Sequence, residues 1–258
     1  MNNFLLKKSA LAAAALLSVA AAHATVITFD GPTVDYSNAP YAQDMGFVFD
    51  GDAIVQNGVT VIGFDNNNVG NEPDGAFVGA LINGSDVANT CAAVQCPTGN
   101  ATNFYAGLDD GVLALTAADA GKLIQLNNFQ VSFLGASGDV LGSTPGVIGI
   151  EGFHADGTSD FIYANLPGPS GGSLKFSNLS MTGTALAGNS YNVINVFAYW
   201  CDSVTDDCST GINNKAQFAI DNIDVTAVAA VPEPGQWALM LAGLGAMGGI
   251  ARRRRRAA

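Results

Sequence analysis

The chain has 258 residues, of which 48% are hydrophobic and 12% charged, and its formal net charge is −12. Seven of its ten basic residues lie near the two ends, so that the stretch from Thr25 to Ala230 keeps only Lys122, Lys175 and Lys215 against 21 acidic residues, a formal charge of −18 (3 minus 21). Such a domain repels nucleic acid and anionic lipid, because neutralising phosphates requires Lys and Arg. The partners that remain are neutral glycans, cations and other proteins.

The first 24 residues have the organisation of a secretory signal peptide. Lys7 and Lys8 precede an apolar stretch from Ala10 to Ala22, and Ala22-His23-Ala24 fits the small-x-small rule for signal peptidase. Cleavage between Ala24 and Thr25 would therefore leave a mature protein that begins at Thr25, exported through the inner membrane.

Residues 25–230 predict one all-β domain, an antiparallel β-sandwich or jelly roll. About a dozen short apolar segments alternate with loops rich in Gly, Asn, Asp and Pro, and a stretch of this length is sufficient for one β domain. The expected strands are 26–29, 46–49, 59–64, 76–81, 112–115, 123–126, 129–134, 147–153, 161–164, 174–181, 191–200 and 217–225. One helical turn is expected at 116–121, where Thr116 and Asp119 have the spacing of a capping box.

Alternation predicts which side chains share a face. Phe129, Val131 and Phe133 share one face of their strand. Ile194, Val196, Ala198 and Trp200 share one face of theirs, and Trp200 is expected in the core. In the last strand Phe218 and Ile220 have one parity while Ile223 and Val225 have the other. All four can point inward only if the strand bulges at Asp221-Asn222. This last strand, 217–225, resembles the closing strand of jelly-roll modules in secreted carbohydrate-binding proteins.

The four cysteines fit an oxidising compartment. Cys91 and Cys96 lie in one polar loop and Cys201 and Cys208 in another, so that two local disulfides are expected, although four cysteines allow three pairings. The spacings C-x4-C and C-x6-C are poor for zinc, and neither loop contains a histidine.

Residue types for catalysis are scarce. Once both end segments are removed, His154 is the only histidine and no arginine remains. The segment Gly168 to Gly172 matches G-x-S-x-G, but it lies in a loop before a strand rather than between a strand and a helix. We therefore expect no enzyme, and the alternative is a secreted hydrolase that uses a pair of carboxylates.

One loop offers oxygen ligands for calcium, the only cofactor that the sequence suggests. Asp65, Asn67 and Asp74 lie in the Gly-containing segment 65–75, and the predicted bulge could add the carboxylate of Asp221. The segment is not an EF-hand, and Asn, Asp and Gly also dominate ordinary turns, so that a solvated loop is the alternative.

The last 28 residues combine three elements in order. Pro232, Glu233 and Pro234 are followed by an apolar run of 15 residues from Trp237 to Ala251, which is short for a transmembrane helix, and then by Arg252, Arg253, Arg254, Arg255 and Arg256. The arginines would stay in the cytoplasm and stop translocation. The order and position of the three elements resemble the PEP-CTERM protein-sorting signal. This resemblance implies that an exosortase-type transpeptidase is a partner and cuts at or near Pro232-Glu233-Pro234. An ordinary tail anchor is the alternative.

The resemblance also implies a role. PEP-CTERM proteins occur in Gram-negative bacteria that make exopolysaccharide, so that we expect a noncatalytic protein of the cell surface or extracellular matrix, associated with exopolysaccharide or biofilm. The inner membrane would be a transient partner and the location periplasmic, surface or extracellular. A carbohydrate-binding module is the first alternative. An exposed row of aromatic residues would favour glycan binding, and its absence would favour a structural role.

Overall fold

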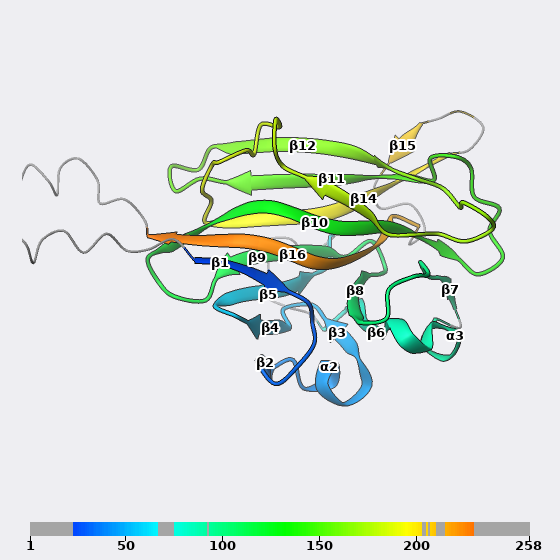
Figure 1. Ribbon diagram of the computed structural model, residues 1–258, viewed down its shortest axis with the longest axis horizontal. Helices are drawn as coiled ribbons and strands as arrows, with labels where there is room; N and C mark the ends of the chain where they lie inside the picture. Colours follow the sequence, from blue (N-terminus) through cyan, green and yellow to red (C-terminus); the bar gives the residue numbers. More distant parts are fainter. Residues whose placement is uncertain are drawn as a thin grey trace, which may run out of the picture. The chain divides into compact units, whose positions relative to one another are not determined.

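The computed structural model describes residues 23–66, 75–91, 93–202, 205, 207–209 and 215–229. These form an all-β, antiparallel, sandwich-like arrangement, as the sequence predicts (Figure 1). The finer assignment to a jelly roll stays a prediction. Residues 1–22 of the predicted signal peptide and the C-terminal segment 230–258 lie outside the described residues. Among the described residues no helix is long and apolar enough to cross a membrane.

The described residues form two sheets of eight strands each, which we call sheet A and sheet B. In order across sheet A lie β13 (Ser177–Ser180), β10 (Lys122–Ala136), β16 (Gln217–Ala229), β8 (Asn103–Gly107), β6 (Phe77–Asn83) and β3 (Phe47–Phe49), with β1 (His23–Ile27) beside β16 and β7 (Val94–Gln95) beside β10. In order across sheet B lie β12 (Ser159–Leu166), β11 (Gly146–Phe153), β14 (Val193–Cys201), β9 (Val112–Ala117), β5 (Val59–Phe64), β4 (Ala53–Gln56) and β2 (Val34–Asn38), with β15 (Cys208–Ser209) beside β14.

Three short helical segments, α2 (Pro40–Met45), η1 (Gly84–Asp86) and α3 (Val87–Thr90), connect strands. The helical turn predicted at 116–121 is wrong. Thr116 and Ala117 continue β9, where they pair with Thr60 and Val59 of β5, because sheet pairing outweighs the local capping signal.

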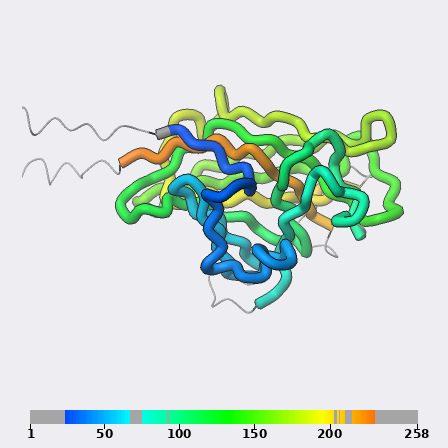
Figure 2. The backbone as a smooth tube through the Cα atoms, turned by 60° about the horizontal axis from the view of Figure 1, so that its bottom comes forward, coloured from blue at the N-terminus to red at the C-terminus, as the bar shows by residue number. Residues whose placement is uncertain are grey.

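The predicted phase change in the last strand is confirmed. Phe218, Ile220, Ile223 and Val225 are fully buried in one core cluster, and Asn222 between them adopts the left-handed conformation at φ +50°. The strand also changes partner here. Before this point β16 pairs with β8, and after it with β1, so that β1 and the end of β16 run side by side in both views (Figures 1 and 2).

The core lies between the two sheets, and the predicted alternation holds on both. Phe129, Val131 and Phe133 of sheet A are buried in this cluster together with Ile194 and Val196 of sheet B. Burial of these apolar side chains is the main driving force for bringing the sheets together.

The outer faces of the two sheets differ. On the outer face of sheet A lies a second cluster that includes Phe104 and Leu134. It is covered by Phe176, just before β13, and by Cys91 and Cys96, between β6 and β8. Among the described residues no comparable cluster covers the outer face of sheet B. That face is where side chains remain available to a ligand.

Candidate functional site

Four aromatic side chains gather on the outer face of sheet B, and we call them the aromatic cluster: Phe161 and Tyr163 on β12, and Phe197 and Tyr199 on β14. Their ring centroids are 5.9 Å apart for Phe161 and Tyr163, 6.1 Å for Phe161 and Phe197, and 5.6 Å for Phe197 and Tyr199. Tyr163 is 71% exposed and Phe161 40% exposed. Large apolar side chains at this exposure, grouped on one face, are typical of an interaction site.

Strand alternation produces the cluster. Residues 161 and 163 have the same parity on β12, and residues 197 and 199 have the same parity on β14, so that each pair projects from one side. β11 lies between these strands, and there Gly149 pairs with both Tyr163 and Phe197. A Cβ atom on Gly149 would lie 2.9 Å from Cε2 of Phe197 and 3.1 Å from Cε2 of Tyr199. The glycine therefore leaves the space that the rings occupy.

The cluster borders a hollow of about 410 Å³ lined by Val147, Phe161, Tyr163, Asn165, Tyr199 and Cys208. Its surface is largely apolar, with the Asn165 amide and the tyrosine hydroxyls as polar groups. Glu151 lies on the same face, one strand from Phe161, and its Oε1 accepts a hydrogen bond of 2.8 Å from Ser159 Oγ. Burial, and secondarily the charge of Glu151, raise the pKa of Tyr199 above its ordinary value. Its hydroxyl can donate a hydrogen bond.

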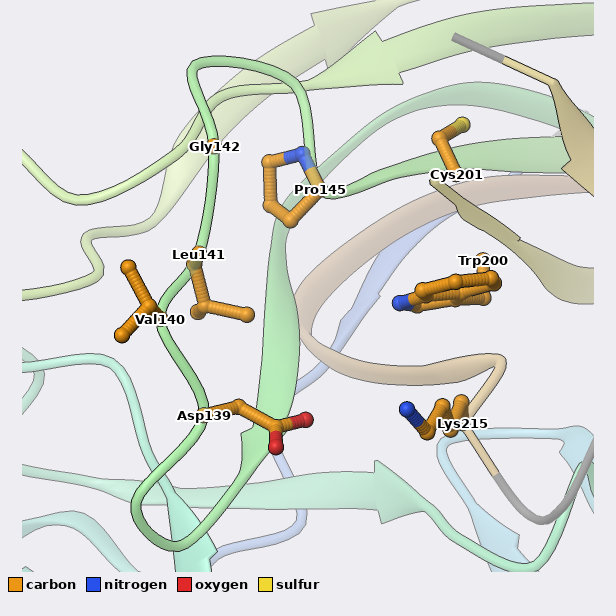
Figure 3. A pocket seen from close by; sticks show the side chains of 8 residues that line it. All are labelled: Asp139, Val140, Leu141, Gly142, Pro145, Trp200, Cys201 and Lys215. Carbon is orange, nitrogen blue, oxygen red and sulfur yellow. The ribbon is translucent and has the colours of Figure 1, made fainter. Parts of the chain in front are cut away.

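A second hollow, of about 130 Å³, lies at the end of β14 and contains Trp200 (Figure 3). The Lys215 Nζ atom is 4.8 Å from the Trp200 ring centroid, and the Asp139 carboxylate lies on the same side of the ring. Trp200 is half-buried and packs against the core, close to the prediction that it is a core residue. Because Lys215 covers this ring, the small hollow offers less stacking surface than the aromatic cluster.

His154, the sole histidine after Thr25, serves a structural network. Its Nε2 atom lies 3.0 Å from Asp160 Oδ2, and its Nδ1 atom lies 3.2 Å from the carbonyl oxygen of Ser190. Tyr191 and Asn189 also donate to Asp160 Oδ2, and the hydrogen bonds from Tyr191 and His154 lower the pKa of Asp160. Both ring nitrogens therefore face acceptor atoms of the protein itself.

The structure contains both expected local disulfides, Cys91–Cys96 and Cys201–Cys208. The first holds the loop that covers sheet A, and the second joins β14 to β15 beside the hollow of the aromatic cluster. Ala24 and Thr25, at the predicted signal-cleavage site, lie in β1 and pair with Thr226 and Val225. The strand that contains this site is thus paired with β16, and cleavage between Ala24 and Thr25 stays a prediction.

The predicted calcium ligands are only partly described. Asn67 and Asp74 lie outside the described residues. Asp65 follows β5, where its backbone N–H donates to Asp50 Oδ1 at 3.0 Å, and burial, together with Asp110 and Asp65, raises the pKa of the nearby Asp109. No cluster of three or more acidic, His or Cys groups suited to a metal occurs among the residues that the structure describes.

Asp221 belongs to a different place from Asp65. Its carboxylate is fully buried and accepts hydrogen bonds from Asn100 and Thr102, which lie just before β8, and from Asn222. The structure therefore does not bring Asp221 together with Asp65, and the bulge directs this carboxylate into a hydrogen-bond network.

Pro232, Glu233, Pro234 and Arg252 to Arg256 lie outside the described residues, so that their assignment depends on sequence comparison. The family model described as the PEP-CTERM protein-sorting motif matches residues 230–256. No curated protein matches the chain.

Solved structures give distant likenesses to the β domain. TmCBM61, solved with β-1,4-galactotriose, is 9% identical with a TM-score of 0.31, covering 66% of this chain and 88% of that one. A cyclase from Fischerella sp. TAU is 14% identical with a TM-score of 0.36, covering 81% of this chain and 100% of the other. The enzymatically active domain of bacteriophage CBA120 tailspike protein 4 is 15% identical with a TM-score of 0.26, covering 76% of this chain and 21% of the tailspike chain.

Likenesses at this level carry no argument about function, and they include both a carbohydrate-binding module and enzymes. The match at the C-terminus is of another kind, because it falls on the Pro-Glu-Pro, apolar and arginine segments in order. The chain thus carries a PEP-CTERM protein-sorting motif at residues 230–256, which implies export through the membrane to the cell surface and processing by an exosortase.

Proposed function

We propose that the mature protein is a noncatalytic protein of the cell surface or extracellular matrix whose β domain binds a neutral polysaccharide through the outer face of sheet B. The observation that carries this proposal is the aromatic cluster, with Tyr163 71% exposed and Phe161 40% exposed beside a hollow of about 410 Å³. An exposed aromatic row is the feature that distinguishes glycan binding from a purely structural role.

The chemistry of the face suits a sugar chain. Aromatic rings supply large, rigid apolar surfaces against which the C–H faces of sugar rings can pack. Polar groups at the edge of the cluster, from Asn165, Glu151 and the two tyrosines, can exchange hydrogen bonds with hydroxyl groups. An apolar lining with a few placed polar groups is the usual composition of a small-molecule site.

Charge favours a neutral ligand. Between Thr25 and Ala230 the formal charge is −18, and none of the three lysines lies among the residues that line the hollow. Anionic polysaccharides and nucleic acids are repelled by such a domain. A second copy of the chain is the other candidate for an apolar face, but two domains of this charge repel each other, whereas a neutral glycan meets no such penalty.

The face is poorly equipped for glycoside hydrolysis. The reaction ordinarily requires two carboxyl groups, about 5 to 9.5 Å apart. Among the described residues at the outer-face positions of β12, β11 and β14, Glu151 is the only carboxylate; Asp160 of β12 has the opposite parity and belongs to the His154 network. Binding without cleavage is therefore the better fit, and a secreted hydrolase is the weaker alternative.

The sorting motif supports a binding site outside the cell. We propose that an exosortase-type transpeptidase cuts at or near Pro232-Glu233-Pro234 after the apolar run and the arginines have held the chain transiently in the inner membrane. The released domain would then associate with exopolysaccharide in the matrix or biofilm. A domain delivered in this way and carrying a glycan-binding face would attach itself to the polymer that surrounds the cell.

Affinity electrophoresis of the exported, processed protein through gels that contain neutral polysaccharides tests the proposal. Tyr163→Ala and Phe161→Ala should each weaken retention on the polysaccharide that binds by about tenfold, the effect of losing one important stacking contact. Tyr41→Ala is the matched control, because Tyr41 is 54% exposed but lies on α2, which contacts β2 at the opposite edge of sheet B from β12.

Three results would contradict the proposal: no retention by any neutral polysaccharide, equal losses in Tyr163→Ala and Tyr41→Ala, or wild-type dimers in light scattering that Tyr163→Ala abolishes. The last result would assign the face to a second copy of this chain.

A further inference from the structure

A further hollow lies on the same face of sheet B as the aromatic cluster. This neighbouring hollow, of about 240 Å³, is lined by Ile62, Phe64, Val112, Ala114, Thr116, Val193 and Asn195. Ala114 and Val112 form a buried floor, and Ile62, Phe64 and Val193 are half-buried at its sides. Its surface is mainly apolar, like that of the first hollow.

A single cross-strand row connects the two hollows. Phe161 on β12 pairs with Glu151 on β11, Glu151 with Asn195 on β14, Asn195 with Ala114 on β9, and Ala114 with Ile62 on β5. Directly paired residues project from the same face of a sheet. The row therefore crosses five strands without interruption, with an aromatic end, a polar middle and an apolar far end.

We propose that the glycan site is this whole row, and that it takes an internal stretch of an extended neutral polysaccharide lying across the strands from β12 to β5. This inference rests on the proposed function and adds to it the form of the ligand. Neighbouring strands lie about 4.8 Å apart, so that four steps from Phe161 to Ile62 span about 19 Å. That length exceeds one sugar ring and requires several linked units.

The polar middle of the row supports a chain rather than two separate ligands. Glu151 lies between the hollows and Asn195 lies at the edge of the hollow of about 240 Å³, where hydroxyl groups of a continuous chain would pass over them. The Glu151 carboxylate is held by Ser159, which leaves its other oxygen atom able to accept from a sugar hydroxyl. Phe197, on the same face of β14 as Asn195, lies beside this crossing and contacts the rings of Phe161 and Tyr199.

A length series of oligosaccharides, cut from the polysaccharide that binds, tests the inference by titration calorimetry. For the wild type the affinity should increase by about tenfold or more between the shortest oligosaccharide that binds and one long enough to cross all five strands. Ile62→Gln and Phe64→Ala should remove this gain and leave affinity for the short oligosaccharide unchanged. The short oligosaccharide also reports that each variant is folded.

Val26→Gln is the matched control, because Val26 is 41% exposed on β1 of sheet A. It should keep the full gain with length. Affinity that does not depend on length, or far-end variants that bind long oligosaccharides as the wild type does, would overturn the extended site while the aromatic cluster still binds. Absence of binding at every length would instead contradict the proposed function itself.

Discussion

Replacing Asp221 by Asn should change how the stability of the protein depends on pH. The Asp221 carboxylate is fully buried, and it accepts hydrogen bonds of 2.7 Å from Asn100 Nδ2, 2.7 Å from the Asn222 backbone N–H and 3.0 Å from Asn222 Nδ2. The hydroxyl of Thr102 lies 3.2 Å from Oδ2 but also 2.5 Å from Asn100 Oδ1. When its single hydrogen is donated to Asn100, the Thr102 oxygen can accept a hydrogen bond from the protonated carboxyl group of Asp221.

The protonated form of Asp221 is therefore accommodated in the fold. Burial raises the pKa of Asp221 from 3.8 to about 6, with a smaller contribution from Asp30, although hydrogen bonds from Asn100, Asn222 and Thr102 act to lower it. Since the folded pKa lies above the unfolded one, the folded state gains stability as the pH falls through 6. The difference of about two pKa units between the folded and unfolded states corresponds to a full gain of about 3 kcal/mol in the free energy of unfolding. About 1.4 kcal/mol of this gain appears between pH 8 and pH 5.

Urea unfolding of the exported protein at pH 8 and pH 5, followed by tryptophan fluorescence, measures this difference. The wild type should gain about 1.4 kcal/mol more than Asp221→Asn on going to pH 5, because other groups that titrate in this range contribute equally to both proteins. The lower limit of the measurements is pH 5. Because the pKa of Asp160 is lowered in the folded state, the stability that its carboxylate contributes is lost in stronger acid. Asp44→Asn, at an exposed position on α2, should keep the wild-type dependence. An equal pH dependence in wild type and Asp221→Asn would show that the pKa of Asp221 is not raised in the folded protein.

Three further predictions concern other parts of the chain. Tyr105→Phe should leave the free energy of unfolding unchanged or raise it by about 1 kcal/mol, because the buried Tyr105 hydroxyl has no hydrogen-bond partner among the described residues. Urea unfolding measures this, and a loss above about 1 kcal/mol would contradict the prediction. Mass spectrometry of the surface protein from cells with a functional exosortase should find no peptide from Trp237–Ala258, and recovery of the intact tail would count against processing. If the loop from Asp65 to Asp74 binds calcium, millimolar calcium should raise the Tm more than sodium at equal ionic strength, and the double Asp→Asn variant should abolish the difference; equal effects of both salts would leave an ordinary solvated loop.

Local pattern was sufficient to predict much of the fold. Alternation identified the inward faces of β10 and β14, and the parity change in β16 located the irregularity at Asp221-Asn222. The short separations in sequence predicted the local disulfides Cys91–Cys96 and Cys201–Cys208. These features depend on neighbours in the chain, which is why sequence alone could predict them.

Features that depend on distant neighbours were missed. The helical turn at Thr116 failed because β9 continues into a pairing with β5 that no local signal reveals. The aromatic cluster was also missed, although the alternation that puts Ile194 and Val196 inward necessarily puts Phe197 and Tyr199 outward. What the pattern lacked was the strand order, which places β12, with Phe161 and Tyr163, one strand away from β14.

We propose that the exported protein binds neutral polysaccharide through the outer face of sheet B. The most direct measurement is the affinity of the processed wild type, Tyr163→Ala and Tyr41→Ala for neutral polysaccharide extracted from the producing cells. Wild type and Tyr41→Ala should bind equally, and Tyr163→Ala should bind about tenfold more weakly. Equal affinity of all three proteins, or no binding by the wild type, would contradict polysaccharide binding through this face.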